Sequence, residues 1–121
     1  MRVTTEALVS RAAFAAATVG AFKGRRRPGL RRRHIPEDTL LYAEAGALVV
    51  DTPTRATRLP MSGHWPVCVS VPATVLAKVC GKLKPGDSLQ LIYAAERLIL
   101  DGGAFILPAR PVRLPAAEEG N

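Results

Sequence analysis

The chain has 121 residues, of which 48% are hydrophobic and 5% aromatic, and its formal net charge at pH 7 is +7. This length suits one compact domain whose core is built from Leu, Val, Ile and Ala. Cys68 and Cys80 are too few for a secreted disulfide framework or a four-ligand zinc site, so we expect two buried thiols in a reducing compartment. No apolar stretch approaches the roughly 20 residues that span a bilayer, which excludes a membrane-spanning helix.

At the start of the chain, Met1 to Thr4 is compatible with a short strand, and an Ala-rich segment follows. We expect a helix from Glu6 to Phe22, with Thr5 as its N-cap. Its apolar stripe would consist of Leu8, Ala12, Ala15, Val19 and Phe22. Organelle transit peptides are also rich in Ala and Arg, but this strand and helix are needed to cover a sheet.

A basic loop from residue 23 to residue 36 follows, and Pro28-Gly29 marks a turn within it. The segment carries seven positive charges in eleven residues and no acid, whereas the rest of the chain has ten basic and ten acidic residues. The seven are Lys23, Arg25, Arg26, Arg27, Arg31, Arg32 and Arg33. A charge concentrated in one segment indicates an anionic partner, although such a run can also be a solvated loop.

A run of strands comes next. The Ala45-Gly46 pair suits a hairpin turn, and Met61 to Pro66 is expected to be a longer turn. The expected strands are Thr39–Glu44, Ala47–Asp51, Thr54–Leu59 and Val67–Val71.

Pro72 suits the first position of a second helix, Ala73 to Leu83. Its buried face would consist of Val75, Leu76, Val79 and Leu83, and its exposed stripe of Thr74, Lys78 and Lys82. The remaining strands are Leu89–Ala94, Leu98–Leu100 and Phe105–Leu107, and Ala95-Glu96 is expected to form the hairpin turn between the first two.

The elements predict an α+β fold in the order β-α-β4-α-β3, with both helices on one face of an antiparallel sheet. Residues 1–112 would form the domain, and residues 113–121 a flexible tail.

The order and spacing of several short motifs resemble one domain of the bacterial DNA sliding clamp, the processivity subunit of replicative DNA polymerase. The resemblance covers residues 1 to about 112. It rests on Met1–Thr4, Glu6–Phe22, Lys23–Arg33, Val69-Ser70-Val71-Pro72-Ala73, Gly86-Asp87-Ser88-Leu89, Arg97-Leu98-Ile99-Leu100 and Phe105-Ile106-Leu107-Pro108.

The resemblance implies helices that line the inside of a ring and face DNA. It directs Arg11, Lys78 and Lys82 toward the duplex and places the basic loop at the rim. A clamp subunit has three such domains, and its partner-peptide pocket lies mainly in the third, so no pocket residue is carried over. The arginine density is also unusual for the family, which suggests a diverged or reduced relative. Encircling DNA would require self-assembly through edge strands, ideally of six copies.

Catalytic groups are sparse. His34 and His64 have no Cys, Asp or Glu at metal-ligand spacing, and Gly102-Gly103 is too short for a phosphate cradle. We therefore expect a non-enzymatic cytoplasmic or nucleoid-associated protein, without cofactor or metal, that contacts the DNA backbone without sequence readout. The alternatives are a protein-interaction module, whose loop binds an acidic partner, and a small RNA-associated basic protein.

Overall fold

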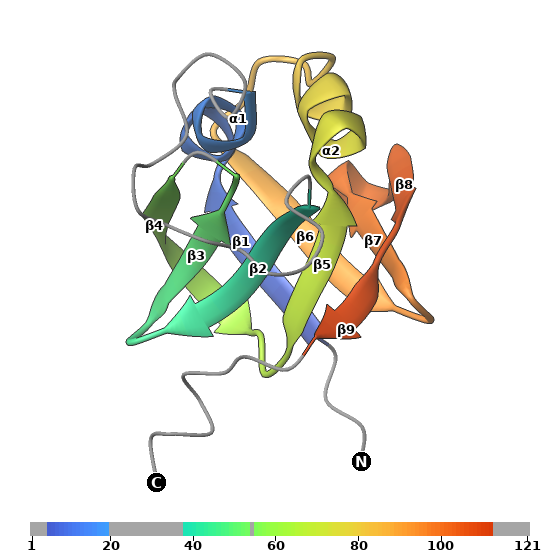
Figure 1. Cartoon of the computed structure of the whole chain (residues 1–121). Helices are drawn as coiled ribbons and strands as arrows, with labels where there is room; N and C mark the ends of the chain where they lie inside the picture. Colours follow the sequence, from blue (N-terminus) through green and yellow to red (C-terminus); the bar gives the residue numbers. More distant parts are fainter. Residues whose placement is uncertain (1–4, 20–37, 54, 113–121) are drawn as a thin grey trace, which may run out of the picture.

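The computed structural model describes residues 5–19, 38–53 and 55–112, which form nine strands, two α-helices and one short 3-10 helix (Figure 1). In chain order the elements are β1 (Thr5–Ser10), α1 (Arg11–Val19), β2 (Asp38–Glu44), β3 (Ala47–Asp51), β4 (Ala56–His64), β5 (Cys68–Pro72), α2 (Ala73–Cys80), β6 (Ser88–Ala94), β7 (Arg97–Leu100), η2 (Asp101–Gly103), β8 (Phe105–Pro108) and β9 (Arg110–Val112). No described helix has both the length and the apolar character that crossing a membrane requires.

All described strands join one antiparallel sheet in the order β8-β7-β6-β1-β4-β3-β2-β5-β9. The sheet has two halves, β8-β7-β6-β1 and β3-β2-β5-β9, and the nine-residue strand β4 connects them. Residues 56–60 of β4 pair with β3, and residues 61–64 pair with β1. Gly63 has φ +117°, and a Cβ there would lie 2.3 Å from the carbonyl oxygen of Glu6, so this crossing requires glycine.

The two helices lie side by side over the same side of the curved sheet (Figure 1). Apolar side chains from both helices and from the strands fill the space between these layers. Phe14 of α1 and Leu76 of α2 are fully buried, as are Leu48, Leu91 and Leu100 of the sheet. A helix layer on a sheet layer is the α+β architecture that the sequence predicts.

The first helix was predicted too early in the chain. Thr5–Ser10 is strand β1, in which Ala7 and Val9 are buried and Leu8 and Ser10 are exposed. This strand pairs with β4 on one side and β6 on the other, and that pairing overrides the helical propensity of its residues. Ser10 replaces Thr5 as the cap, since the Ala13 N–H donates to Ser10 Oγ at 3.3 Å.

The apolar stripe predicted for that helix is wrong in part, although Ala15 packs against the core as predicted. Leu8 belongs to the strand and Ala12 is exposed, whereas Phe14, Ala17 and Thr18 are buried. The predicted strand Met1–Thr4 and residues 20–22 lie outside the described residues.

Three further boundaries differ from the prediction. Met61–His64 belongs to β4, although a turn was expected there, because β1 supplies a second pairing partner. Pro72 ends β5 one residue before α2 begins, and α2 ends at Cys80, before the expected Leu83. The number of strands after α2 also differs from the prediction. Four strands follow α2, whereas three were predicted, and the additional strand is β9, which contains Pro111.

Candidate nucleic-acid interface

The exposed face of α2 carries the two predicted lysines. Thr74, Val75, Lys78, Val79 and Lys82 line a shallow groove of about 240 Å³. Lys78 and Lys82 are exposed, as the sequence predicted, whereas Val75 was expected to be buried and is 39% exposed. This face therefore combines two cations with a small apolar floor.

The chain continues to turn after α2 ends, which keeps Lys82 beside the helix. The Gly81 N–H donates to Ala77 O at 3.0 Å, and the Lys82 N–H donates to Val79 O at 2.9 Å. Lysines at a helix C-terminus interact favourably with its partial negative charge. Lys84, also exposed, adds a third cation just beyond this turn. Lys84 was not among the predicted contacts, although its position two residues after Lys82 could have indicated it.

The basic loop lies outside the described residues. All seven of its predicted DNA contacts, from Lys23 to Arg33, fall between the end of α1 at Val19 and the start of β2 at Asp38. Their place at a rim beside the helices therefore stays a prediction.

Arg11 has partners that the sequence did not predict. Its Nη2 donates to Asp101 Oδ1 at 2.9 Å, and only 15% of its side chain is exposed. The guanidinium packs against Gly86, and the Arg11 N–H donates to Asp87 O at 3.3 Å. The side-chain hydrogen bond raises the pKa of Arg11 and lowers that of Asp101. Arg11 thus ties α1 to two distant turns, and its contact with DNA stays a prediction.

The contact between the helices positions the face of α2. Thr18 of α1 and Cys80 of α2 are both buried where the two helices pack together, and burial raises the pKa of the Cys80 thiol to about 11. Cys80 is therefore a neutral thiol at pH 7. Cys68 is buried as well, which confirms the prediction of two buried thiols.

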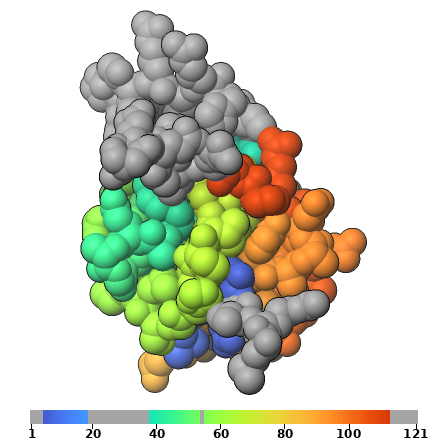
Figure 2. All heavy atoms as spheres, turned by 90° about the horizontal axis from the view of Figure 1, so that it is seen from below, coloured from blue at the N-terminus to red at the C-terminus, as the bar shows by residue number. Residues whose placement is uncertain are grey.

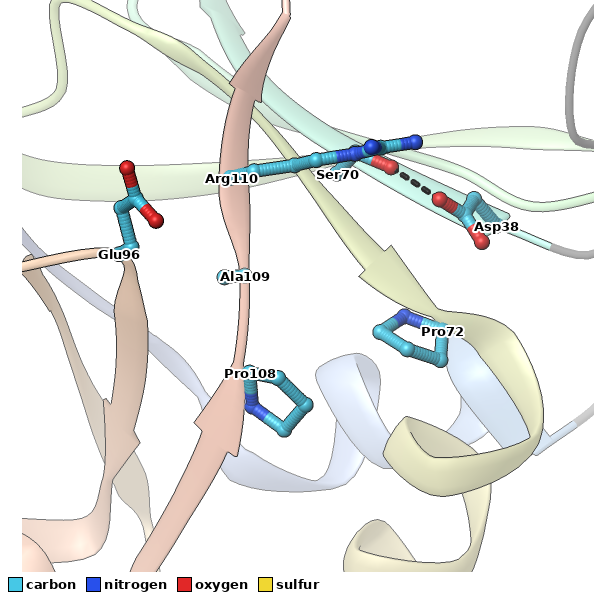
Figure 3. A pocket seen from close by; sticks show the side chains of 7 residues that line it. All are labelled: Asp38, Ser70, Pro72, Glu96, Pro108, Ala109 and Arg110. Carbon is cyan, nitrogen blue, oxygen red and sulfur yellow. Dashed lines mark hydrogen bonds between the residues drawn. The ribbon is translucent and has the colours of Figure 1, made fainter.

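A second and larger pocket, of about 410 Å³, lies between β5 and the segment that joins β8 to β9 (Figure 3). The residues that line it are Asp38, Ser70, Pro72, Glu96, Pro108, Ala109 and Arg110. Ser70 Oγ donates to a carboxylate oxygen of Asp38, and Arg110 extends across Ser70 toward that pair. The sequence did not indicate this pocket, because its walls come together only through the β5–β9 pairing.

The described residues offer little catalytic chemistry. His64 is exposed at the end of β4, and the neighbouring Trp65 is buried and donates from Nε1 to Leu41 O at 3.1 Å. Across residues 5–19, 38–53 and 55–112, no three His, Cys, Asp or Glu side chains gather as metal ligands.

Solved structures show where this arrangement occurs. The sliding clamp (DNA polymerase III subunit beta) of Pseudomonas aeruginosa, solved bound to griselimycin, superposes with a TM-score of 0.66 at 21% identity, covering 91% of this chain and 31% of that chain. This chain resembles one domain of a bacterial DNA sliding clamp.

Two further clamps show the same match. The Caulobacter crescentus clamp has a TM-score of 0.65 at 25% identity, covering 89% of this chain and 31% of that chain. The Bacillus subtilis clamp has a TM-score of 0.66 at 10% identity, covering 94% of this chain and 34% of that chain. The clamp-like chain thus spans about a third of each clamp's length. No family model matches the sequence, and no curated protein does.

Proposed function

We propose that this chain is a non-enzymatic, clamp-like protein that associates with duplex DNA through phosphate contacts, without reading its sequence. The observation that carries this function is the exposed lysine pair, Lys78 and Lys82, on the helix side of a clamp-like fold. Phosphate contacts fix position on a duplex but carry no base information. This function would place the protein in the cytoplasm, at the nucleoid.

The basic loop would supply most of the binding energy. Arginine is always charged and binds phosphate oxygens in pairs, so a cluster of six suits a polyanion. Each neutralised phosphate contributes about −0.9 to the slope of log affinity against log salt on duplex DNA. The proposed contacts are Arg11, Lys23, Arg25, Arg26, Arg27, Arg31, Arg32, Arg33, Lys78 and Lys82.

The test is a salt titration of duplex binding, followed by fluorescence anisotropy. Replacing the six loop arginines with Ala should weaken binding strongly and flatten the salt slope by about five units if five or six engage phosphate. The Lys78→Ala/Lys82→Ala variant should flatten the slope by about two units. If wild type and the six-arginine variant bind equally weakly, the proposal fails.

A matched control separates a site from general charge. Arg97 and Arg110 are exposed, and their strands β7 and β9 are visible on the side opposite the helices (Figure 2). The Arg97→Ala/Arg110→Ala variant removes the same two charges as the lysine variant. It should keep the wild-type slope; an equal loss would mean that only net charge matters.

Two further features of the proposal need separate tests. Competition between duplex DNA and RNA distinguishes DNA association from the RNA-associated alternative.

We also propose self-assembly through edge strands, since encircling a duplex requires more than one such domain. Light scattering at high protein concentration tests this, and a strict monomer removes the ring but not DNA binding.

The larger pocket favours a second function, a protein-interaction module. Pro72, Pro108 and Ala109 give it apolar walls, and Arg110 offers a guanidinium beside the carboxylates of Asp38 and Glu96. An apolar peptide that carries a single carboxylate is the suitable probe. Its binding should be lost in Arg110→Glu and kept in Lys78→Ala/Lys82→Ala, which is the opposite of the pattern expected for DNA.

A further inference from the structure

One carboxylate is shared by two cations at the start of α1. Arg11 Nη2 donates to Asp101 Oδ1 at 2.9 Å, and this hydrogen bond is the main cause that lowers the pKa of Asp101. The charge of Lys84, which is exposed, lowers the same pKa further. Lys84 belongs to the segment that joins α2 to β6, and this segment lies on the helix side of the sheet (Figure 1). The cluster therefore holds two positive charges and one negative charge.

The guanidinium of Arg11 is incompletely hydrogen-bonded in this cluster. Its Nε and Nη1 atoms are buried and have no hydrogen-bond partner among the residues that the structure describes. A buried donor without a partner costs free energy, because its hydration is lost and nothing replaces it. Another acceptor that drew Arg11 outward would satisfy these donors, so the pair with Asp101 is replaceable.

The rim of the cluster carries little side-chain bulk. Gly102 and Gly103 follow Asp101 and are exposed, and a Cβ on either glycine would meet nothing within 4 Å. Gly86 is also exposed and packs directly against the guanidinium of Arg11. Glycine allows the close approach of a ligand, and the unesterified oxygens of a phosphodiester match the guanidinium fork. A DNA phosphate is therefore a suitable second acceptor for Arg11.

We propose that the Asp101 carboxylate competes with a DNA phosphate for Arg11. In the free protein Arg11 bonds to Asp101, and on a duplex it exchanges this carboxylate for a phosphate. Asp101 thereby weakens DNA binding, because the contact of Arg11 forms only when the pair breaks. The inference rests on the proposed DNA association and adds a residue that opposes it.

The first experiment removes the competing charge and repeats the salt titration of duplex binding. Asp101→Asn leaves a side chain of the same shape, and a neutral amide holds a guanidinium less strongly than a carboxylate does. Its binding should be tighter than that of the wild type, and its slope should be steeper by about 0.9, the value of one further phosphate contact.

A matched control separates this competition from net charge. Asp87→Asn removes the same charge from a neighbouring exposed position, where the Asp87 backbone oxygen, and not its carboxylate, accepts a hydrogen bond from Arg11. Its slope should stay at the wild-type value. In an Arg11→Ala background, Asp101→Asn should change binding no more than Asp87→Asn does. Equal steepening by the two substitutions in the wild-type background would overturn the proposal.

The second experiment releases Arg11 without changing any charge. A Cβ at Gly86 would lie 2.8 Å from Arg11 Nε, so Gly86→Ala should push the guanidinium away from Asp101. This variant should also bind duplex more tightly and with a steeper slope, and the gain should disappear in Arg11→Ala. Gly81→Ala is the matched control, since a Cβ there meets its nearest atom at 3.5 Å.

The outcomes distinguish this inference from the proposed function. Suppose that the wild type binds duplex and loses binding in the lysine and six-arginine variants, while Asp101→Asn and Gly86→Ala keep the wild-type slope. The competition is then wrong, and the proposed function stands. A wild type that does not bind duplex at low salt would overturn both.

Discussion

Asp101 accepts a hydrogen bond from Arg11 while its own backbone has φ +57°, in the left-handed region. Asn adopts this conformation readily, so Asp101→Asn removes the charge and keeps the turn. The pKa of Asp101 is lowered from its ordinary 3.8, chiefly by the Arg11 hydrogen bond. A carboxyl group whose pKa is lower in the folded state stabilises the fold above its unfolded pKa, and this contribution is lost as the pH falls through the folded value.

The wild type should therefore be more stable than Asp101→Asn at pH 7, and the advantage should shrink toward zero below about pH 3.8. Urea unfolding of both proteins from neutral to acidic pH measures this difference in the free energy of unfolding. In an Arg11→Ala background the same substitution should lose this pH dependence. An advantage that persists unchanged in acid would show that the ion pair does not cause it.

The chemistry of the candidate site was predictable at this scale in part. The positions of Lys78 and Lys82 follow from helical spacing, and both are exposed as predicted. The partner of Arg11 was not predictable, because Asp101 lies ninety residues away and meets it only after the sheet forms. The Val75 prediction failed because helical periodicity identifies an apolar face but not how much of it a sheet covers.

At the scale of elements, β4 depends on its close approach to β1. Gly63→Ala should cost about 2 kcal/mol or more, because the new Cβ meets the Glu6 backbone at a positive φ. Gly46→Ala is the matched control: its φ is +80° and nothing lies within 4 Å, so strain alone should cost about 1 kcal/mol. Urea denaturation measures both, and equal losses would contradict a special role for the crossing.

Turn residues close in sequence predicted the hairpins correctly. The strands that pair with segments far along the chain were assigned wrongly or missed. Ala45-Gly46 and Ala95-Glu96 form the expected two-residue turns, and all four residues have positive φ. Glu6–Ser10 read as helix because Ala-rich sequence has high helical propensity, while its partner strands lie far along the chain. β9 was missed because its proline argues against a strand, although an edge position tolerates it.

At the scale of the whole molecule, the net charge of +7 couples stability to anions. If only the folded state binds duplex DNA, a free DNA concentration one hundred times Kd should raise the free energy of unfolding by about 2.7 kcal/mol. Thermal melting with and without duplex measures this effect. The six-arginine variant, melted with the same DNA concentration, should show little of it; an equal shift in both proteins would argue against the basic loop.

The continuous path of β4 has a mechanical consequence. One strand lies in both halves of the sheet, so neither half can detach while the other keeps its hydrogen bonds intact. β8 and β9, at the two ends of the strand order, are also joined directly through Ala109, so a second chain segment ties one end of the sheet to the other. We therefore expect the two halves of the sheet to unfold together as one cooperative unit.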